Sequence, residues 1–408
     1  MEKIIIVDPL STGRMYAKAF VSRGIECIAV MSSDSLTEHF MSSMIPDDFI
    51  KIYHWKPEIL NELKELNPVA IVAGCESAIY LAEFLADELG LSGNPVSTSL
   101  IRRKKNEMQY ALRDNGISYI RSILVKNIKD VDKICEELSQ TKKYVIKPIN
   151  SAGTEGVLML NGRDEVKRAL YSSAWNNINV VGEMNEGYVI QDFMVGPEYV
   201  VDMVAFGDTY VIASVCKYTK IKLNECDFVY KDLKTLEPSN DDLQEIIKYA
   251  KLAAKALKIK VGPIHMEIIN TEQGPVMVEA GARLHGGVGP YLFNHTYEPN
   301  LVDLSVDSYL GKESKIENDM VKLNTIGKVC FFYCSKEIEF KMPNKEIIAE
   351  LNSIPEYKGH NYFVGDGEKV CPTTGVATIP GLFWLCAENE ETLDKREKEI
   401  RDLLWNYE

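Results

Sequence analysis

The sequence predicts an α/β and α+β protein, with an N-terminal parallel α/β domain followed by strand-rich regions. Two observations carry this prediction. The first hundred residues alternate short apolar runs with amphipathic segments, which is the pattern of βαβ units and a parallel sheet. From Tyr119 onward, strand signals follow one another closely, which favours an α+β arrangement. The 408 residues are enough for two or three domains.

Three apolar runs near the N-terminus predict the strands of the parallel sheet, because strands buried on both faces read as unbroken apolar segments. They span residues 4–7, 25–30 and 70–73. Helix patterns at 15–23 and from about 76 to 89 alternate with them. The loop after the first run, residues 8–13, lacks the G-x-G-x-x-G pattern, so no dinucleotide site is indicated.

Residues 97–106 form a boundary that contains the basic run Arg102-Arg103-Lys104-Lys105. Beyond it, the sequence predicts a hairpin of strands 264–269 and 275–279 around a turn at 271–274. The other elements expected after the boundary are a strand that ends at 145–148, strands at 188–194 and 198–206, and helices at 241–257 and 391–404.

The amino-acid composition argues against some classes of binding partner and indicates the cellular compartment of the protein. The formal net charge is −14, from 60 acidic and 46 basic residues, whereas a nucleic-acid binder usually carries a basic excess. The nine cysteines are scattered and odd in number, which indicates free thiols in a reducing cytoplasm. No apolar run approaches the ~20 residues of a membrane span, and none resembles a signal peptide.

Lys147 lies at a predicted strand end and precedes a loop of small residues, 151–156. An ammonium group beside backbone N–H groups that glycine leaves accessible is suited to a polyphosphate. The lysine precedes the glycines, so the spacing is not that of a P-loop. A solvated lysine next to a surface loop explains the same residues equally well.

Glu267 and Glu279 each lie within an apolar strand of the predicted hairpin. Two facing carboxylates are costly unless a cation neutralises them, and Mg²⁺ prefers carboxylate and phosphate oxygens. The alternative is a pair of solvent-facing glutamates on an edge strand.

The segment after Glu279 adds Arg283, Gly286 and Gly287. The guanidinium could contact a substrate carboxylate, and the two glycine N–H groups could bind the developing oxyanion. A surface ion pair is the alternative for Arg283. His265 and His285 flank the same strands. A histidine near a magnesium site more often contacts the substrate or a metal-binding residue than the metal itself. Lys217 and Lys220 read as solvated lysines.

Taken in order, these motifs resemble the ATP-grasp superfamily, in which a nucleotide binds between two α+β lobes. The resemblance covers about residues 1–310. It implies that Lys105 and Lys147 contact phosphates, that the loop with Ser151 and Gly153 covers them, and that Glu267 and Glu279 bind Mg²⁺. It also implies that Arg283 stabilises the reacting carboxyl group of the substrate.

The family also implies a hinge that holds adenine and ribose. Here Gln191 stands where many members have glutamate, the backbones of Asp192 and Met194 would meet the adenine, and Glu198 would bind the ribose hydroxyls. Many relatives have asparagine two residues after the second glutamate, but this chain has Gly281, so the second Mg²⁺ would have a poorer ligand set or use water.

Within the superfamily the chain looks most like bacterial L-amino-acid ligases. The residues involved are Gly74 to Ser77, 89–94, Gly281 and Arg283-x-x-Gly286-Gly287. The resemblance implies ATP and Mg²⁺ as cofactors, small-molecule substrates such as amino acids, and a homodimer. Expected activity is amide formation through an acyl phosphate. The alternatives are another carboxylate–amine ligase, such as one of purine biosynthesis, or a non-catalytic ATP-binding module.

The resemblance also divides the chain. Residues 1–100 would form the N-terminal domain, 101–310 the ATP-grasp domain with a mobile lobe around 120–190, and 311–408 a strand-rich segment packed on that core.

Overall fold

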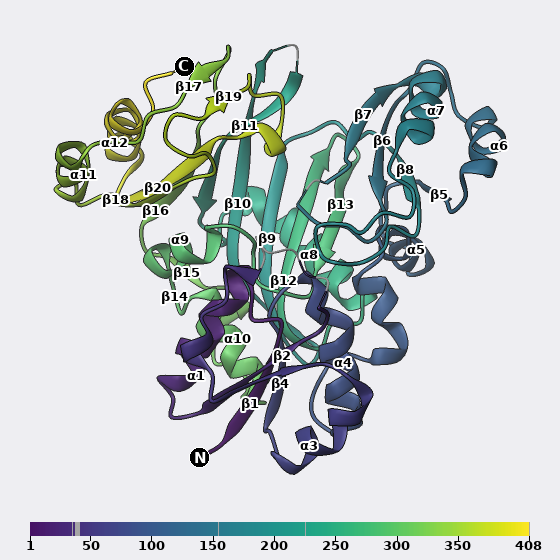
Figure 1. Cartoon of the computed structure of the whole chain (residues 1–408), viewed down its shortest axis with the longest axis vertical. Helices are drawn as coiled ribbons and strands as arrows, with labels where there is room; N and C mark the ends of the chain where they lie inside the picture. The colour runs from purple at the N-terminus through teal and green to yellow at the C-terminus, as the bar shows by residue number, and fades with distance from the viewer. Residues whose placement is uncertain (35, 37–40, 154, 225, 408) are drawn as a thin grey trace.

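The three predicted N-terminal strands form a parallel sheet together with β3, which no apolar run predicts, in the order β3-β2-β1-β4 (Figure 1). The computed structural model describes residues 1–34, 36, 41–153, 155–224 and 226–407. The four strands are β1 (Lys3–Val7), β2 (Glu26–Met31), β3 (Lys51–His54) and β4 (Ala70–Ala73). The helical segments between and after them are η1 (Ser11–Arg14), α1 (Met15–Val21), η2 (Pro46–Asp48), η3 (Pro57–Ile59), α3 (Leu60–Glu65), η4 (Glu76–Ala78) and α4 (Ile79–Glu88).

A central eight-stranded sheet follows, in the order β13-β12-β9-β10-β11-β16-β20-β18. All neighbouring strands pair antiparallel, and short connections join β9 to β10, β10 to β11 and β12 to β13. The bounds are β9 (Glu198–Phe206), β10 (Thr209–Leu223), β11 (Cys226–Leu236), β12 (Val261–Thr271), β13 (Gly274–Gly281), β16 (Ile326–Phe331), β18 (Tyr357–Tyr362) and β20 (Gly381–Ala387). The predicted hairpin is thus β12–β13, with the turn where it is expected.

Apolar side chains fill both faces of this sheet. One face packs against α4, α5 (Lys105–Asp114) and α8 (Gln244–Ala256), and the other against α1, α9 (Gly289–Thr296) and α10 (Leu301–Tyr309). The same two cores include the two faces of the N-terminal sheet, so the parallel sheet and the central sheet share their packing.

A separate four-stranded antiparallel sheet stands at the upper right of Figure 1, in the order β5-β8-β6-β7. It comprises β5 (Ser122–Val125), β6 (Lys143–Pro148), β7 (Leu158–Asn161) and β8 (Tyr188–Asp192), with α6 (Val131–Glu136) and α7 (Gly162–Ser172) on one face. Strand β8 ends at Asp192, two residues before the sequence pattern does, because the chain there leaves the ladder to cross to β9.

The last hundred residues complete the central sheet through β16, β18 and β20, and α11 (Lys345–Asn352) and α12 (Glu390–Leu404) pack on them. Because these strands continue the sheet without a break, the domain boundary near 310 stays a prediction. The remaining short elements are η5 (Val96–Arg102), η6 (Ile128–Asp130), η7 (Asp241–Leu243), β14 (Tyr297–Glu298), η8 (Glu317–Asp319), β15 (Lys322–Leu323), β17 (Ile338–Glu339), β19 (Lys369–Val370) and η9 (Val376–Thr378).

All nine cysteines are free thiols. Within the described part of the chain, every helix is too short or too polar to cross a bilayer.

Candidate active site

Glu267 and Glu279 are direct cross-strand partners in the β12–β13 hairpin. Their side chains are 28% and 27% exposed, so both reach the surface of the sheet where a solute can approach. A register shift follows Glu267. Burial alone would raise the pKa of Glu279, but Lys105, Lys147 and Arg283 outweigh it and lower that pKa to about 2. This carboxylate is therefore ionised at neutral pH.

Two lysines from different elements supply the opposing charge. Lys105 begins α5, and its Nζ donates to the Ser151 carbonyl at 2.6 Å and lies 3.4 Å from Glu279 Oε2. Lys147 comes from β6 and is 6% exposed. Burial lowers the pKa of Lys147, and Glu279 partly offsets that effect. The two lysines and the two glutamates thus form one electrostatic cluster between the central sheet and the four-stranded sheet.

The loop that follows Lys147 is fastened to the segment before β8. The Ser151 hydroxyl donates to the Glu155 carboxylate, which also accepts the Val180 N–H at 3.0 Å. Gly153 has a φ of +64°, a conformation that other residues adopt only with strain, and a Cβ there would meet open space. Its glycine is therefore required by backbone conformation rather than by crowding. Thr154, within the predicted phosphate loop, lies outside the described residues.

The predicted adenine hinge connects β8 to β9. Gln191 is buried and its amide nitrogen lies 3.0 Å from the Ser122 hydroxyl oxygen. The Asp192 N–H already donates to the Arg121 carbonyl, so of its backbone groups only the carbonyl could meet a base. The Met194 N–H has no partner among the residues that the structure describes.

Glu198, at the start of β9, is 8% exposed. Lys220 forms an ion pair with it, and the Tyr230 hydroxyl donates to Oε1 at 3.1 Å. Burial and the nearby Glu267 raise the pKa of Glu198. The expectation that Lys220 is a solvated lysine is wrong, because this ion pair holds it against β9.

Arg283 is mostly buried, with 15% of its side chain exposed, and is held by a residue that follows β4 of the N-terminal sheet. Its Nε donates to Glu76 Oε2 at 2.9 Å, and Nη1 donates to the Leu284 carbonyl at 2.8 Å. The other oxygen of Glu76 accepts from Arg103 at 2.7 Å, and Arg103 also contacts Glu183 at 2.7 Å. Sequence reasoning missed Glu76 and Arg103 as site residues. Glu76 does follow a buried strand, which is a usual place for functional side chains in parallel sheets.

Gly286 and Gly287 lie between Arg283 and the start of α9. Neither N–H has a hydrogen-bond partner among the described residues, and Gly287 has a φ of +60°. Unpaired amides just ahead of a helix N-terminus are suited to a negatively charged oxygen.

A buried Asp–His–His cluster lies beneath the hairpin. Asp202 on β9 contacts His265 Nδ1 and His285 Nδ1, each at 2.9 Å, and accepts from the Ser214 hydroxyl at 2.6 Å. His265 Nε2 lies 3.7 Å from Glu267 Oε1. Burial would lower the pKa of His265, but Asp202 and Glu267 raise it to about 9. Sequence reasoning named both histidines and missed Asp202, since an aspartate inside an apolar strand gives no spacing signal.

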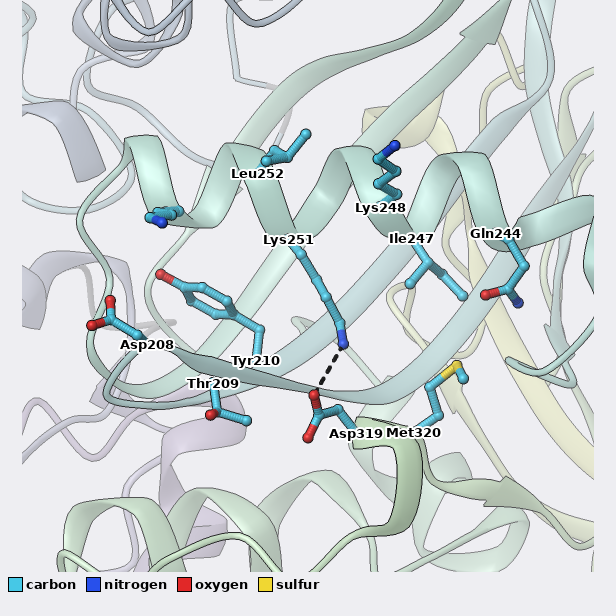
Figure 2. Close-up of a pocket in the computed structure, with 11 residues that line it drawn as sticks. Asp208, Thr209, Tyr210, Gln244, Ile247, Lys248, Lys251, Leu252, Asp319 and Met320 are labelled. Carbon is cyan, nitrogen blue, oxygen red and sulfur yellow. Dashed lines mark ion pairs between the residues drawn. The ribbon is translucent and has the colours of Figure 1, made fainter.

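A hollow of about 440 Å³ lies elsewhere, beside α8 (Figure 2). Lys248, Lys251 and Lys255 face it from the helix, and Lys251 Nζ is 3.5 Å from Asp319 Oδ2. None of the predicted site residues lines it, so it is not part of the candidate active site.

Comparisons with known proteins find one matching family model and related ligases. Residues 140–290 match the ATP-grasp domain model. Dapdiamide A synthase of Enterobacter agglomerans is 27% identical over 98% of this chain and 96% of its own length. The L-arginine-specific L-amino acid ligase of Bacillus subtilis is 25% identical over 60% of this chain and 58% of its own.

Solved structures show the same fold. L-amino acid ligase from Bacillus licheniformis superposes with a TM-score of 0.77 over 99% of this chain and 98% of its own, at 18% identity. N5-carboxyaminoimidazole synthase from Aspergillus clavatus, solved with ADP, gives 0.71 over 98% of both chains, at 14% identity.

Proposed function

Because this chain is an ATP-grasp carboxylate–amine ligase, we propose that it joins two amino acids by way of an acyl phosphate and releases ADP and phosphate. The observation that supports this proposal most is the cluster of Glu267, Glu279, Lys105 and Lys147, with Arg283 at its end. It offers two carboxylates for a cation, two ammonium groups for phosphates and a guanidinium for a carboxylate.

The donor set fits Mg²⁺. Glu267 and Glu279 are adjacent, partly exposed oxygen ligands, and the low pKa of Glu279 means that no proton has to be displaced. Gly281 adds no side-chain ligand. When bound, Mg²⁺ supplies positive charge to the phosphate oxygens during transfer.

The chain's own residues perform the rest. The hinge at Gln191, Asp192 and Met194 holds the adenine, and Glu198, oriented by Lys220 and Tyr230, accepts from the ribose hydroxyls. Lys105 and Lys147 balance the charge on the phosphates while the substrate carboxylate attacks the γ-phosphorus in line. Ser151 and Gly153, in the loop above, exclude water that would hydrolyse the acyl phosphate.

Amide formation then uses the other end of the site. The amine of the second amino acid attacks the acyl carbon, and the oxyanion forms beside Arg283 and the N–H groups of Gly286 and Gly287. The tetrahedral intermediate then expels phosphate, which leaves as hydrogen phosphate with the proton that the amine nitrogen gives up, and the amide remains. Arg283 is fixed by Glu76 in advance, so it need not reorganise during the reaction.

The decisive experiment measures ADP and phosphate over pairs of the twenty amino acids, with mass spectrometry of the products. Glu279→Ala should abolish ADP formation, whereas Glu272→Ala, in the turn of the same hairpin, should leave it unchanged. Retained turnover in Glu279→Ala contradicts the metal assignment. ADP formation with purine precursors but no amino-acid pair identifies a purine ligase instead, and ATP binding without ADP formation identifies a binding module.

Two further expectations belong to this proposal. Eight of the nine free cysteines are buried or half-buried and unpaired, which is typical of a reducing compartment, and we place the enzyme in the cytoplasm. We also expect a homodimer, which light scattering on the purified protein tests directly.

A further inference from the structure

Asp202 links two parts of the candidate site that are distant in sequence. Its Oδ1 contacts the imidazole of His265, two residues before Glu267, and its Oδ2 contacts that of His285, two residues after Arg283. All three side chains are buried: Asp202 is 0% exposed, and the histidines 7% and 5%.

An ionised carboxylate can only accept hydrogen bonds, so both imidazoles must donate to Asp202 from Nδ1. This fixes the ring orientation of each histidine. The Nε2 of His265 then lies toward Glu267 Oε1, at 3.7 Å. The contact limits the directions that the Glu267 carboxylate can take. The Nε2 of His285 faces α9 instead, because a Cβ at Gly289 would lie 2.9 Å from it.

His285 is held from the opposite side as well. A Cβ at Gly289, the first residue of α9, would lie 2.5 Å from His285 Cδ2, so the ring packs directly against the helix backbone. The Phe293 ring approaches it edge-on with centroids 5.3 Å apart. Asp202 on one side and α9 on the other therefore fix the start of the Gly286–Gly287 segment.

From this geometry we infer that Asp202 is a positioning residue that acts on two parts of the candidate site. Through His265 it orients Glu267 toward the metal, and through His285 it places the Arg283–Gly287 loop that receives the oxyanion. The inference rests on the proposed function, since it assigns Glu267 to the metal and the loop to amide formation.

The same three residues could in principle hold a metal ion themselves, because their ligand atoms lie within 4.8 Å of one another. Their hydrogen bonds argue against that use. Both Nδ1 atoms and both Asp202 oxygens already satisfy one another, and the Ser214 hydroxyl occupies a further position on Oδ2.

The test compares Asp202→Asn, His265→Gln and His285→Gln with Asp232→Asn, a buried aspartate on β11 outside the site. Two quantities are measured: the Kd of Mn²⁺ for the ADP-bound protein by calorimetry, and the number of ADP molecules formed per amide. Loss of an outer partner of a metal ligand typically weakens binding by about 10–100-fold.

We expect His265→Gln to raise the Mn²⁺ Kd alone, His285→Gln to raise the ADP-to-amide ratio alone, and Asp202→Asn to raise both. Equal effects of the two histidine variants on both readouts would overturn the inference, and so would an Asp202→Asn protein that matches Asp232→Asn. If Asp202→Asn does not fold, the histidine pair decides.

The wild-type protein separates this inference from the proposed function. If it forms no ADP with any amino-acid pair, the proposed function fails, and the Mn²⁺ Kd still tests the His265 branch. A stoichiometric transition metal in the purified protein that His285→Gln releases would also overturn the positioning role.

Discussion

Arg102 and Arg103 are consecutive residues, yet their guanidinium groups enter two different kinds of ion network. Arg102 is 0% exposed and donates all five of its N–H groups: two to Glu83, and one each to the Thr98 hydroxyl and to the carbonyls of Pro95 and Leu257. Arg103 instead shares the Glu76 carboxylate with Arg283 and contacts Glu183, whose side chain is 38% exposed.

The difference separates a structural network from a functional one. The Arg102 network is closed, since each charge has its full set of partners and nothing is left to bind a ligand. The Arg103 network is open, since it ends on Arg283 at the candidate site and on the partly exposed Glu183, which also accepts from Asn150 just ahead of the predicted phosphate loop. Changes in the first should affect stability, and changes in the second should affect turnover.

The largest expected effect is that of Arg102→Ala. It leaves Glu83 buried and unpaired, which costs about 3–5 kcal/mol of unfolding free energy. Urea denaturation measures this loss. The double variant Arg102→Met with Glu83→Leu should recover most of the stability, because removing both charges leaves no unpaired charge in the buried site. A double variant as unstable as the single one contradicts the assignment of this pair.

Glu76→Gln should act on the reaction instead. In Glu76 one carboxylate oxygen accepts from Arg103 and the other from Arg283, whereas glutamine offers one acceptor oxygen and an NH2 group. The hold on Arg283 therefore weakens, and kcat for amide formation should fall by about 10²-fold, as when one oxyanion donor is removed. The unfolding free energy should change less than in Arg102→Ala. Glu83→Gln is the control, and it should show the reverse pattern. Equal kcat values for Glu76→Gln and wild type would show that Glu76 has no role in the reaction.

The third prediction concerns pH. The pKa of Glu279 is lowered to about 2 in the folded protein, so its stabilising contribution is fully present above the ordinary value of 4.5 and is lost as the pH falls toward 2. The stability advantage of wild type over Glu279→Gln should therefore shrink progressively as the pH falls from about 5 toward 2, by about 1.4 kcal/mol per pKa unit at most. Denaturation across this range measures the gap, and a gap independent of pH contradicts the ion cluster.

The smallest effect is expected within the same basic run. Lys104 pairs with the exposed Glu186 at 2.5 Å, and such surface pairs contribute about 0–1 kcal/mol. Lys104→Ala should leave both the unfolding free energy and the Kd of ADP nearly unchanged. Lys105→Ala, one residue later, should weaken ADP binding in the same calorimetric titration. If both variants bind ADP equally, Lys105 does not contact phosphate.

Much of the candidate site was accessible from sequence because its residues occur in locally recognisable settings. Glu267 and Glu279 lie in a hairpin whose strands and turn follow from alternation and a Thr–Gly turn, and Lys147 follows from a strand end before a glycine loop. The partners of these residues were not accessible. Glu76 and Arg283 are 207 positions apart, and Asp202 meets two histidines that lie 63 and 83 positions away.

By itself the sequence determined the fold class and the β12–β13 hairpin, because hydrophobic period and turn chemistry act over a few residues. The ordered set of phosphate and metal candidates came from the resemblance of its motifs to a family. Only the tertiary structure decided what each charge in the run Arg102 to Lys105 does. Four adjacent basic side chains leave the backbone in different directions, and which carboxylate each one meets depends on how α4, β13 and the loop before β8 pack around them.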